Sequence, residues 1–147
     1  MAAGLRLSRV SIAMNEISFS GRCFCGDLVF EVAGPARYSC FCHCESCRRA
    51  AGGVYVAWAT FVKNSFVVMD GNMIWHRSAP QVTRGHCSRC GTSLTYERAD
   101  RAGEIDVTLT SFDDPSEFSP KAHIWVEDKL PWVSIDDGLP QYLQTVT

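Results

Sequence analysis

Residues 40–47 read Cys-Phe-Cys-His-Cys-Glu-Ser-Cys, and two shorter groups, Cys23-Phe24-Cys25-Gly26 and Cys87-Ser88-Arg89-Cys90-Gly91, complete a set of eight cysteines. Thiolates that bind a tetrahedral zinc ion come from short C-x-C or C-x-x-C segments, two ligands from each. The glycine after each of the two shorter groups permits a turn that directs backbone amides toward the sulfur atoms. The spacing therefore predicts zinc binding.

The three groups divide into one complete and one incomplete set of zinc ligands. The two shorter groups together supply the four thiolates of a structural site, namely Cys23, Cys25, Cys87 and Cys90. The central group supplies three, namely Cys42, Cys44 and Cys47. Three protein ligands and an open position are typical of catalytic zinc. We therefore predict two zinc ions, one structural and one catalytic and exchangeable.

The cysteines allow two other interpretations. A disulfide framework is disfavoured because residues 1–15 contain no apolar run of signal-peptide length, and because C-x-C pairs have poor disulfide geometry. Cys40 stands in an apolar setting and is expected to be a buried small side chain. The alternative for Cys40 is a spare fourth ligand for the central group.

Composition limits the class of protein. A length of 147 residues favours one domain, and metal sites would contribute noticeably to its folding. A net charge of -2 and a pI near 6.0 give no electrostatic signature of nucleic-acid or anionic-membrane binding. The apolar runs are far too short to span a membrane. We expect a soluble cytoplasmic protein, and a homo-oligomer is compatible with this composition.

Alternating apolar and polar residues dominate the chain and predict a mainly β fold. The expected strands cover residues 28–32, 54–59, 66–69, 93–96 and 105–109. Only residues 45–51 favour a helix, since they are rich in helix formers and end at Gly52-Gly53. We expect a flexible N-terminal extension over residues 1–14 and a single zinc-binding domain over residues 15–147.

The cysteine motifs and their flanking residues resemble a known family. The resemblance rests on Gly21–Gly26, Cys42–Arg48, Cys87–Leu94, Leu109–Pro115, His123–Trp125, Pro131-Trp132 and Asp137–Pro140. These segments are similar to the glutathione-dependent formaldehyde-activating enzyme family, also called the Gfa/centromere-protein-V family. The resemblance covers nearly all of residues 17–142. It implies an Mss4-like zinc-binding β fold with one short helix near the central cysteines, and the same division into structural and catalytic zinc.

Family resemblance also implies an activity. The leading hypothesis is a zinc-dependent carbon–sulfur lyase-like enzyme that interconverts glutathione and formaldehyde with S-hydroxymethylglutathione. The first alternative is the same site acting on another thiol or aldehyde. The second is a non-catalytic zinc-stabilised binding module, for which a long basic extension would be expected rather than a short leader with Arg6 and Arg9. The third is a purely structural pair of zinc sites, closed by Cys40 or His43.

Several side chains near the central cysteines are open to more than one interpretation. His43 could act as an acid, a base or the fourth ligand, or be an exposed loop side chain. Arg48 and Arg49 could bind a substrate carboxylate, or belong to a solvated helix face.

Aromatic and acidic residues farther along the chain are expected to be structural. Trp58 and Phe61 are expected in the core rather than in a pocket wall. The remaining histidines, His76, His86 and His123, show no zinc-ligand spacing. Asp136 and Asp137 are expected to be solvated turn residues.

Overall fold

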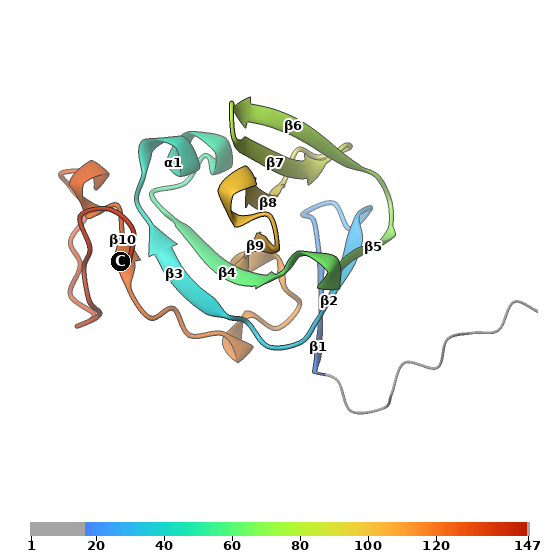
Figure 1. Cartoon of the computed structure of the whole chain (residues 1–147), viewed down its shortest axis with the longest axis horizontal. Coiled ribbons are helices and arrows are strands. Elements are labelled where there is room, and N and C mark those ends of the chain that lie inside the picture. The colour runs from blue at the N-terminus through green and yellow to red at the C-terminus, as the bar shows by residue number, and fades with distance from the viewer. Residues whose placement is uncertain (1–16, 147) are drawn as a thin grey trace, which may run out of the picture.

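A computed structural model describes residues 17–146, and ten strands of this part of the chain form two sheets (Figure 1). The smaller sheet has the order β1-β2-β5, with strands Ser18–Arg22, Val29–Ala33 and Phe66–Asp70. The larger sheet has the order β10-β3-β4-β9-β8-β7-β6. Its strands are His123–Ile124, Tyr38–Cys42, Val56–Val62, Glu104–Thr108, Ser93–Arg98, Val82–Cys87 and Met73–Ala79. The predicted extension over residues 1–14 lies outside the described residues.

Most neighbouring strands are antiparallel, and the exception brings distant parts of the chain together. Strand β10 pairs with β3 in parallel, so that Ile124 lies opposite Cys42. Segments near both ends of the described chain therefore meet beside the central cysteines, at the left of Figure 1.

The α-helix α1 spans Glu45–Ala51 and begins where the sequence predicts. Cys44 is its N-cap, and the Cys44 sulfur accepts a hydrogen bond from the amide of Cys47. Gly52 ends the helix with a φ of 66°, a left-handed conformation that glycine adopts without steric cost. Short 3-10 turns occupy Lys63–Ser65, Ala99–Arg101, Leu109–Ser111, Pro115–Glu117 and Val126–Asp128.

The hydrophobic core has two parts. The larger part is aromatic and aliphatic, and its largest fully buried members are Phe30, Phe61, Leu28, Leu94 and Ile105. The smaller part surrounds the central cysteines and consists of Cys40, Cys42, Cys47, Val56 and Trp58. The central cysteines are thus embedded in packed structure rather than carried on a surface loop.

The mainly β prediction is confirmed, with one α-helix in the described chain, but five strands were missed, namely β1, β3, β6, β7 and β10. Strand β10 has two residues, too few to show a pattern. Strand β3 contains Cys42, which the spacing assigned to metal binding rather than to a strand, and Cys40, which was expected to be buried without being assigned to a strand. Strand β6 is exposed along nearly its whole length, so it shows no alternation of apolar and polar residues. Strands β1 and β7 are interrupted by glycine, which weakens the strand signal.

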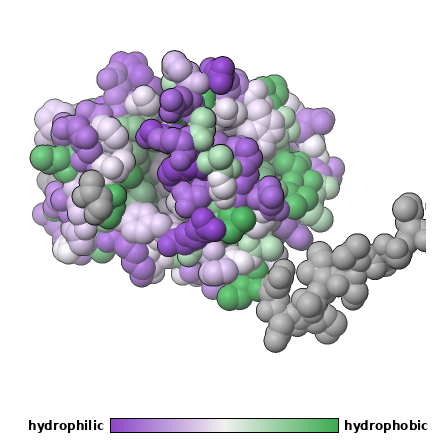
Figure 2. Space-filling view, viewed as in Figure 1, coloured by the Kyte–Doolittle hydropathy of each residue, from purple (hydrophilic) through white to green (hydrophobic). Residues whose placement is uncertain are grey.

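No helix of the described residues is long and apolar enough to cross a membrane. On the face shown in Figure 2 the middle is mainly hydrophilic, and hydrophobic side chains gather toward the right, over β5. Val67 and Met69 of this strand are exposed.

Candidate metal centres

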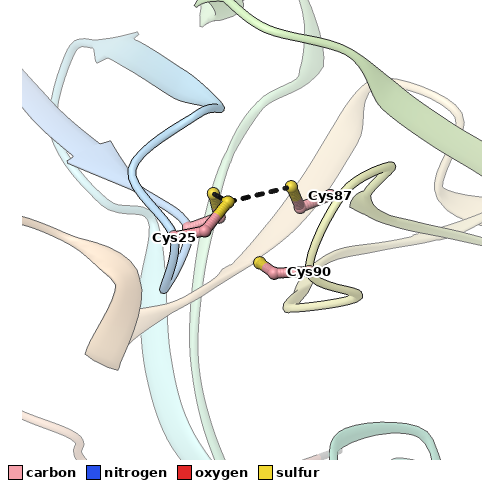
Figure 3. A group of neighbouring side chains, drawn as sticks. Cys25, Cys87 and Cys90 are labelled. Atoms are coloured by element: carbon pink, nitrogen blue, oxygen red, sulfur yellow. Dashed lines mark hydrogen bonds between the residues drawn. The ribbon is translucent and has the colours of Figure 1, made fainter.

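Four cysteines meet between two turns that are distant in sequence (Figure 3). Cys23 and Cys25 follow β1, whereas Cys87 ends β7 and Cys90 lies in the next turn. Their four sulfur atoms all lie within 4.8 Å of one another. The Sγ–Sγ distance is 3.5 Å from Cys23 to Cys25 and 4.0 Å from Cys25 to Cys87.

This set of donors fits a zinc ion. Zinc–sulfur bonds of about 2.3 Å in a tetrahedron place the sulfur atoms about 3.8 Å apart, close to the distances observed here. The amide of Leu28 donates to Cys23 Sγ at 3.3 Å, and the amide of Arg89 donates to Cys87 Sγ at 3.4 Å. Such hydrogen bonds stabilise thiolates, which is the form that binds metal.

Thr92 joins the two turns and was not anticipated from the sequence. Its hydroxyl accepts a hydrogen bond from the amide of Phe24 at 3.1 Å and lies 3.0 Å from Cys90 Sγ. Because the hydroxyl proton remains free, it can be donated to the sulfur. This contact is the main reason that the pKa of Cys90 falls to about 5. Thr92 therefore supports the thiolate form of an exposed ligand.

Thr92→Val should weaken zinc binding at the four-cysteine cluster, because valine keeps the shape of threonine but cannot donate to Cys90. Loss of such an outer contact costs roughly 10- to 100-fold in metal affinity. Competition with a zinc chelator measures the change. Thr110→Val serves as the control, because Thr110 is an exposed threonine beside the same cavity as Thr92. Equal zinc affinity in the two variants would contradict the assigned role of Thr92.

The three remaining predicted ligands also meet. Cys42 ends β3, Cys44 caps α1 and Cys47 lies in the first turn of that helix. Their sulfur atoms all lie within 4.8 Å of one another, and the metal-ligand group formed by the described residues contains no fourth donor. Cys42 and Cys47 are buried, whereas Cys44 is only partly covered. Three thiols that are accessible from one side fit a zinc ion whose fourth coordination position is open to a substrate or water.

Contacts among the three thiols shift their pKa values in opposite directions. Contacts with Cys42 and Cys44, and then the charge of Arg84, lower the pKa of Cys47 far below its ordinary value. The same contacts with Cys44 and Cys47, together with burial, raise the pKa of Cys42. Of the three thiols, Cys47 is thus the one whose surroundings most favour the thiolate form.

Cys40 stays outside this cluster. Its side chain is 6% exposed, and burial is the main reason that its pKa rises to about 12. A buried neutral thiol agrees with the expected packing role. It gives no support to Cys40 as a fourth ligand.

Arg84 is the cation that accompanies the three-cysteine cluster, and nothing in the sequence indicated it. Its side chain is 4% exposed, and Nη2 donates to Cys47 Sγ at 3.6 Å. The guanidinium carbon lies 4.7 Å from the centre of the Tyr96 ring. Tyr96 is on β8, directly opposite Arg84 on β7. The contact between Arg84 and Cys47 joins a strand to a helix 37 positions away in the sequence, so local patterns could not reveal it.

His43 is buried and belongs to a chain of three polar side chains. His43 Nε2 and His123 Nδ1 are 2.8 Å apart, and His123 Nε2 lies 2.8 Å from a carboxylate oxygen of Asp137. Burial, followed by the nearby His123, lowers the pKa of His43 to about 4. His43 is therefore neutral at physiological pH. Its other ring nitrogen, Nδ1, is buried without a hydrogen-bond partner among the described residues.

His43 is not an exposed loop side chain, and it does not join the three sulfur atoms in a ligand group. His123 is buried and Asp137 is exposed, as expected for a structural and a solvated residue. What the sequence did not predict is that the two join His43 in one chain of contacts. Sequence alone gave no sign of this chain, since its members are 80 and 14 residues apart.

The two arginines after Cys47 already have partners in the protein. Arg48 donates to the backbone carbonyl groups of His43 and Asp128, at 3.1 and 3.3 Å. Arg49 pairs with Glu45 on the exposed face of α1. Neither arginine lines the two cavities beside the cluster, which favours the structural interpretation of both.

Asp137→Asn should destabilise the fold at neutral pH, because a neutral amide attracts His123 less than a carboxylate does. The hydrogen bond with His123 is the main reason that the pKa of Asp137 lies below its ordinary value. A carboxyl group with a lowered pKa stabilises the fold at pH values above its pKa in the unfolded chain, about 3.9. This contribution disappears as the pH falls through the lower pKa that the group has in the folded protein. The difference in urea midpoint between wild type and variant should therefore be largest near neutral pH and should decrease at acidic pH.

Urea titrations at several pH values test this expectation, with Asp136→Asn as the control one residue earlier. A difference that is the same at every pH would show that Asp137 does not act through its charge.

Two cavities adjoin the three-cysteine cluster, with volumes of about 550 and 490 Å³. Both are lined by Cys44, Tyr96, Arg98 and Trp125, so they meet at the most accessible thiol of the cluster. The first cavity also has His76, Arg84 and Asp128 in its wall. The second has Trp58 and an ion pair between Arg101 and Asp106. Trp58 therefore belongs to both the core and a cavity wall, whereas Phe61 lies in the core alone.

Comparison with known proteins places these features in context. The family model described as glutathione-dependent formaldehyde-activating enzyme matches residues 18–128. The crystal structure of a Rhodobacter sphaeroides protein is similar to this chain with a TM-score of 0.53 and 20% sequence identity, over 84% of this chain and 98% of that chain. At this identity the similarity supports the fold alone. A comparison with curated proteins gives no match.

The fold is mainly β and carries two groups of cysteines that could each bind a metal ion. These two features place the protein in the class of small β proteins with cysteine metal sites. The family match spans most of the chain and includes both cysteine clusters. The chain belongs to the glutathione-dependent formaldehyde-activating enzyme family, as its motifs indicated. Within the chain of hydrogen bonds from His43, His123 lies inside the matched region and Asp137 lies beyond it.

Proposed function

We propose that this protein is a carbon–sulfur lyase that interconverts glutathione and formaldehyde with S-hydroxymethylglutathione. The observation that carries the proposal is the three-cysteine cluster, open on the side of Cys44 and lying where two cavities meet. In the direction of synthesis a bond forms between the glutathione sulfur and the formaldehyde carbon. The carbonyl electron pair moves to oxygen, which takes up a proton, and the thiol proton is lost.

We assign separate roles to the two clusters. Cys42, Cys44 and Cys47 would hold the catalytic zinc, and Cys23, Cys25, Cys87 and Cys90 the structural zinc. Zinc, when bound, supplies positive charge that stabilises a thiolate and polarises a carbonyl oxygen. The buried positions of Cys42 and Cys47 fix two donors rigidly, and the partly covered Cys44 leaves a route by which substrate approaches.

The shape of the site favours a thiol that carries groups on both sides of its sulfur. Glutathione has its thiol on the central residue, with a charged γ-glutamyl group on one side and a glycine carboxylate on the other. Cavities on both sides of Cys44 would accommodate the two ends while the sulfur faces the cluster.

The activity is tested by measuring exchange between formaldehyde and S-hydroxymethylglutathione by NMR, with and without zinc-loaded protein. We expect the protein to accelerate exchange with glutathione, and to accelerate exchange with 2-mercaptoethanol much less. Acceleration of both to the same extent would indicate an enzyme for another thiol. No acceleration of either would favour a zinc-stabilised binding module.

A further inference from the structure

Arg84 is a buried cation whose negative partner is a group of sulfur atoms. None of the ion pairs formed within residues 17–146 involves Arg84. Its one side-chain hydrogen bond in this part of the chain goes to Cys47 Sγ. A buried charge without a partner is strongly destabilising, so a buried arginine requires negative charge nearby. Glu45 and Asp128 line the same cavity, but among the described residues only a cysteine sulfur lies within hydrogen-bond distance of the guanidinium.

The neighbouring arginine shows the contrast. Arg98 lines the first cavity together with Arg84 and also the second, but its Nε and Nη2 donate to the Asp100 carboxylate, at 2.9 and 2.6 Å. Its charge is therefore largely neutralised by a partner of its own. Arg84 has no such carboxylate, and its charge acts on the cluster and on whatever occupies the adjoining cavity.

Arg84 is held in place by several contacts and offers charge more than hydrogen bonds. Strands β6 and β8 flank it, with His76 and Tyr96 as its cross-strand neighbours. The guanidinium lies over the Tyr96 ring, a favourable position for a cation. Its Nη1 is buried and has no hydrogen-bond partner among the described residues.

We propose that Arg84 is the charge partner of the three-cysteine cluster and that its positive charge allows the cluster to accept a thiolate. This inference rests on the proposed function. Three thiolates around a divalent ion carry one net negative charge, which would repel a further anion. Arg84 cancels that charge from a buried position, where screening by salt is weak. Arg84 is thus a positioning residue for an anionic substrate sulfur.

The test compares two ligands that differ at sulfur alone. Glutathione can present a thiolate, whereas S-methylglutathione has the same carboxylates and ammonium group but no ionisable sulfur. We expect Arg84→Met to weaken glutathione binding roughly 10- to 100-fold. Binding of S-methylglutathione should stay within about twofold of wild type, as for a substitution remote from the ligand. Isothermal titration calorimetry on protein restored to two zinc ions per chain measures both affinities.

Matched variants separate charge from structure. Methionine is suited to the test because apolar replacement of a buried charge is often tolerated, and Arg84→Gln is a second neutral variant. Arg84→Lys keeps the charge and should retain most of the preference for glutathione. Arg98→Met, in the same cavities, should leave the ratio of the two affinities unchanged.

Three results would overturn the inference. Equal weakening of both ligands by Arg84→Met would show that Arg84 binds a carboxylate. Unchanged binding of both would show that its charge does not reach the site. Loss of the preference in Arg84→Lys, to the same extent as in the neutral variants, would show that the role is one of shape.

A parallel comparison of 2-mercaptoethanol with its S-methyl ether distinguishes this inference from the proposed function. If the wild type binds 2-mercaptoethanol with a preference that depends on Arg84, but does not bind glutathione, the proposed substrate is wrong and the role of Arg84 stands. If glutathione binds and Arg84→Met does not alter the preference, the substrate stands and the role of Arg84 is wrong.

Discussion

Cys90→Ser is expected to remove most of the stability of the fold. Zinc binding at a four-cysteine site contributes folding free energy directly, with apparent values of about 10–16 kcal/mol in small zinc-dependent peptides. Loss of one of four thiolates should remove several kcal/mol of this, compared with a typical total stability of about 5–15 kcal/mol. Because Cys90 itself is exposed, its replacement loses little packing, and the effect reports on the metal site.

The measurement is urea unfolding followed by circular dichroism, with zinc content determined on the same samples. Ser88→Ala lies in the same turn, is exposed and should leave the midpoint nearly unchanged. A soluble Cys90→Ser variant with the wild-type midpoint would refute the assignment of a structural ion to this cluster.

Cys44→Ser should have the opposite consequence, with the fold intact and the activity lost. The Cys44 sulfur caps α1 by accepting from the Cys47 amide, and serine is a preferred N-cap residue that can replace this contact. The hydroxyl is a far poorer zinc ligand than a thiolate. We expect zinc content to fall from about two to about one per chain. Activity should fall by roughly 100-fold or more.

Cys40→Ala is the matched control, because Cys40 is a neutral buried thiol outside the ligand group. It should keep both zinc ions. If Cys44→Ser instead empties both clusters, the two metal sites do not bind independently, and the separate roles proposed here would fail. If Cys40→Ala loses one zinc ion, Cys40 closes the central site and that site is structural.

The features predicted from sequence are those that local spacing determines. Each cysteine group is a short segment, so its thiols lie close together whatever the rest of the chain does. The joining of Cys23 and Cys25 with Cys87 and Cys90 was predicted from the four donors that a tetrahedral ion needs, and the fold does bring both predicted sets of thiols together. The helix after Cys44 was predicted for the same reason, since its cap, composition and terminal glycine lie within ten positions. Strands with clear alternation, such as β9, were also found.

The features that were missed depend on contacts between distant segments. Arg84 lies in β7, a strand that the sequence did not predict, and only the packing of β7 against α1 brings it to Cys47. His43 appears as a loop residue, and only the parallel pairing of β10 with β3 buries it against His123. Thr92 is close to Cys90 in sequence, but its contact with Phe24 crosses 68 positions.

The burial of His43 by the C-terminal part of the chain has a consequence for biosynthesis. The partner of His43 follows it by 80 residues, so the central cysteines leave the ribosome well before the segment that covers their loop. At about 5–20 residues per second, this interval lasts roughly 4–16 s. During it the nascent thiols are open to oxidants, stray copper and non-native partners among the other cysteines. Translation rate and cellular redox state would thus influence how much of the newly made protein acquires its correct metal.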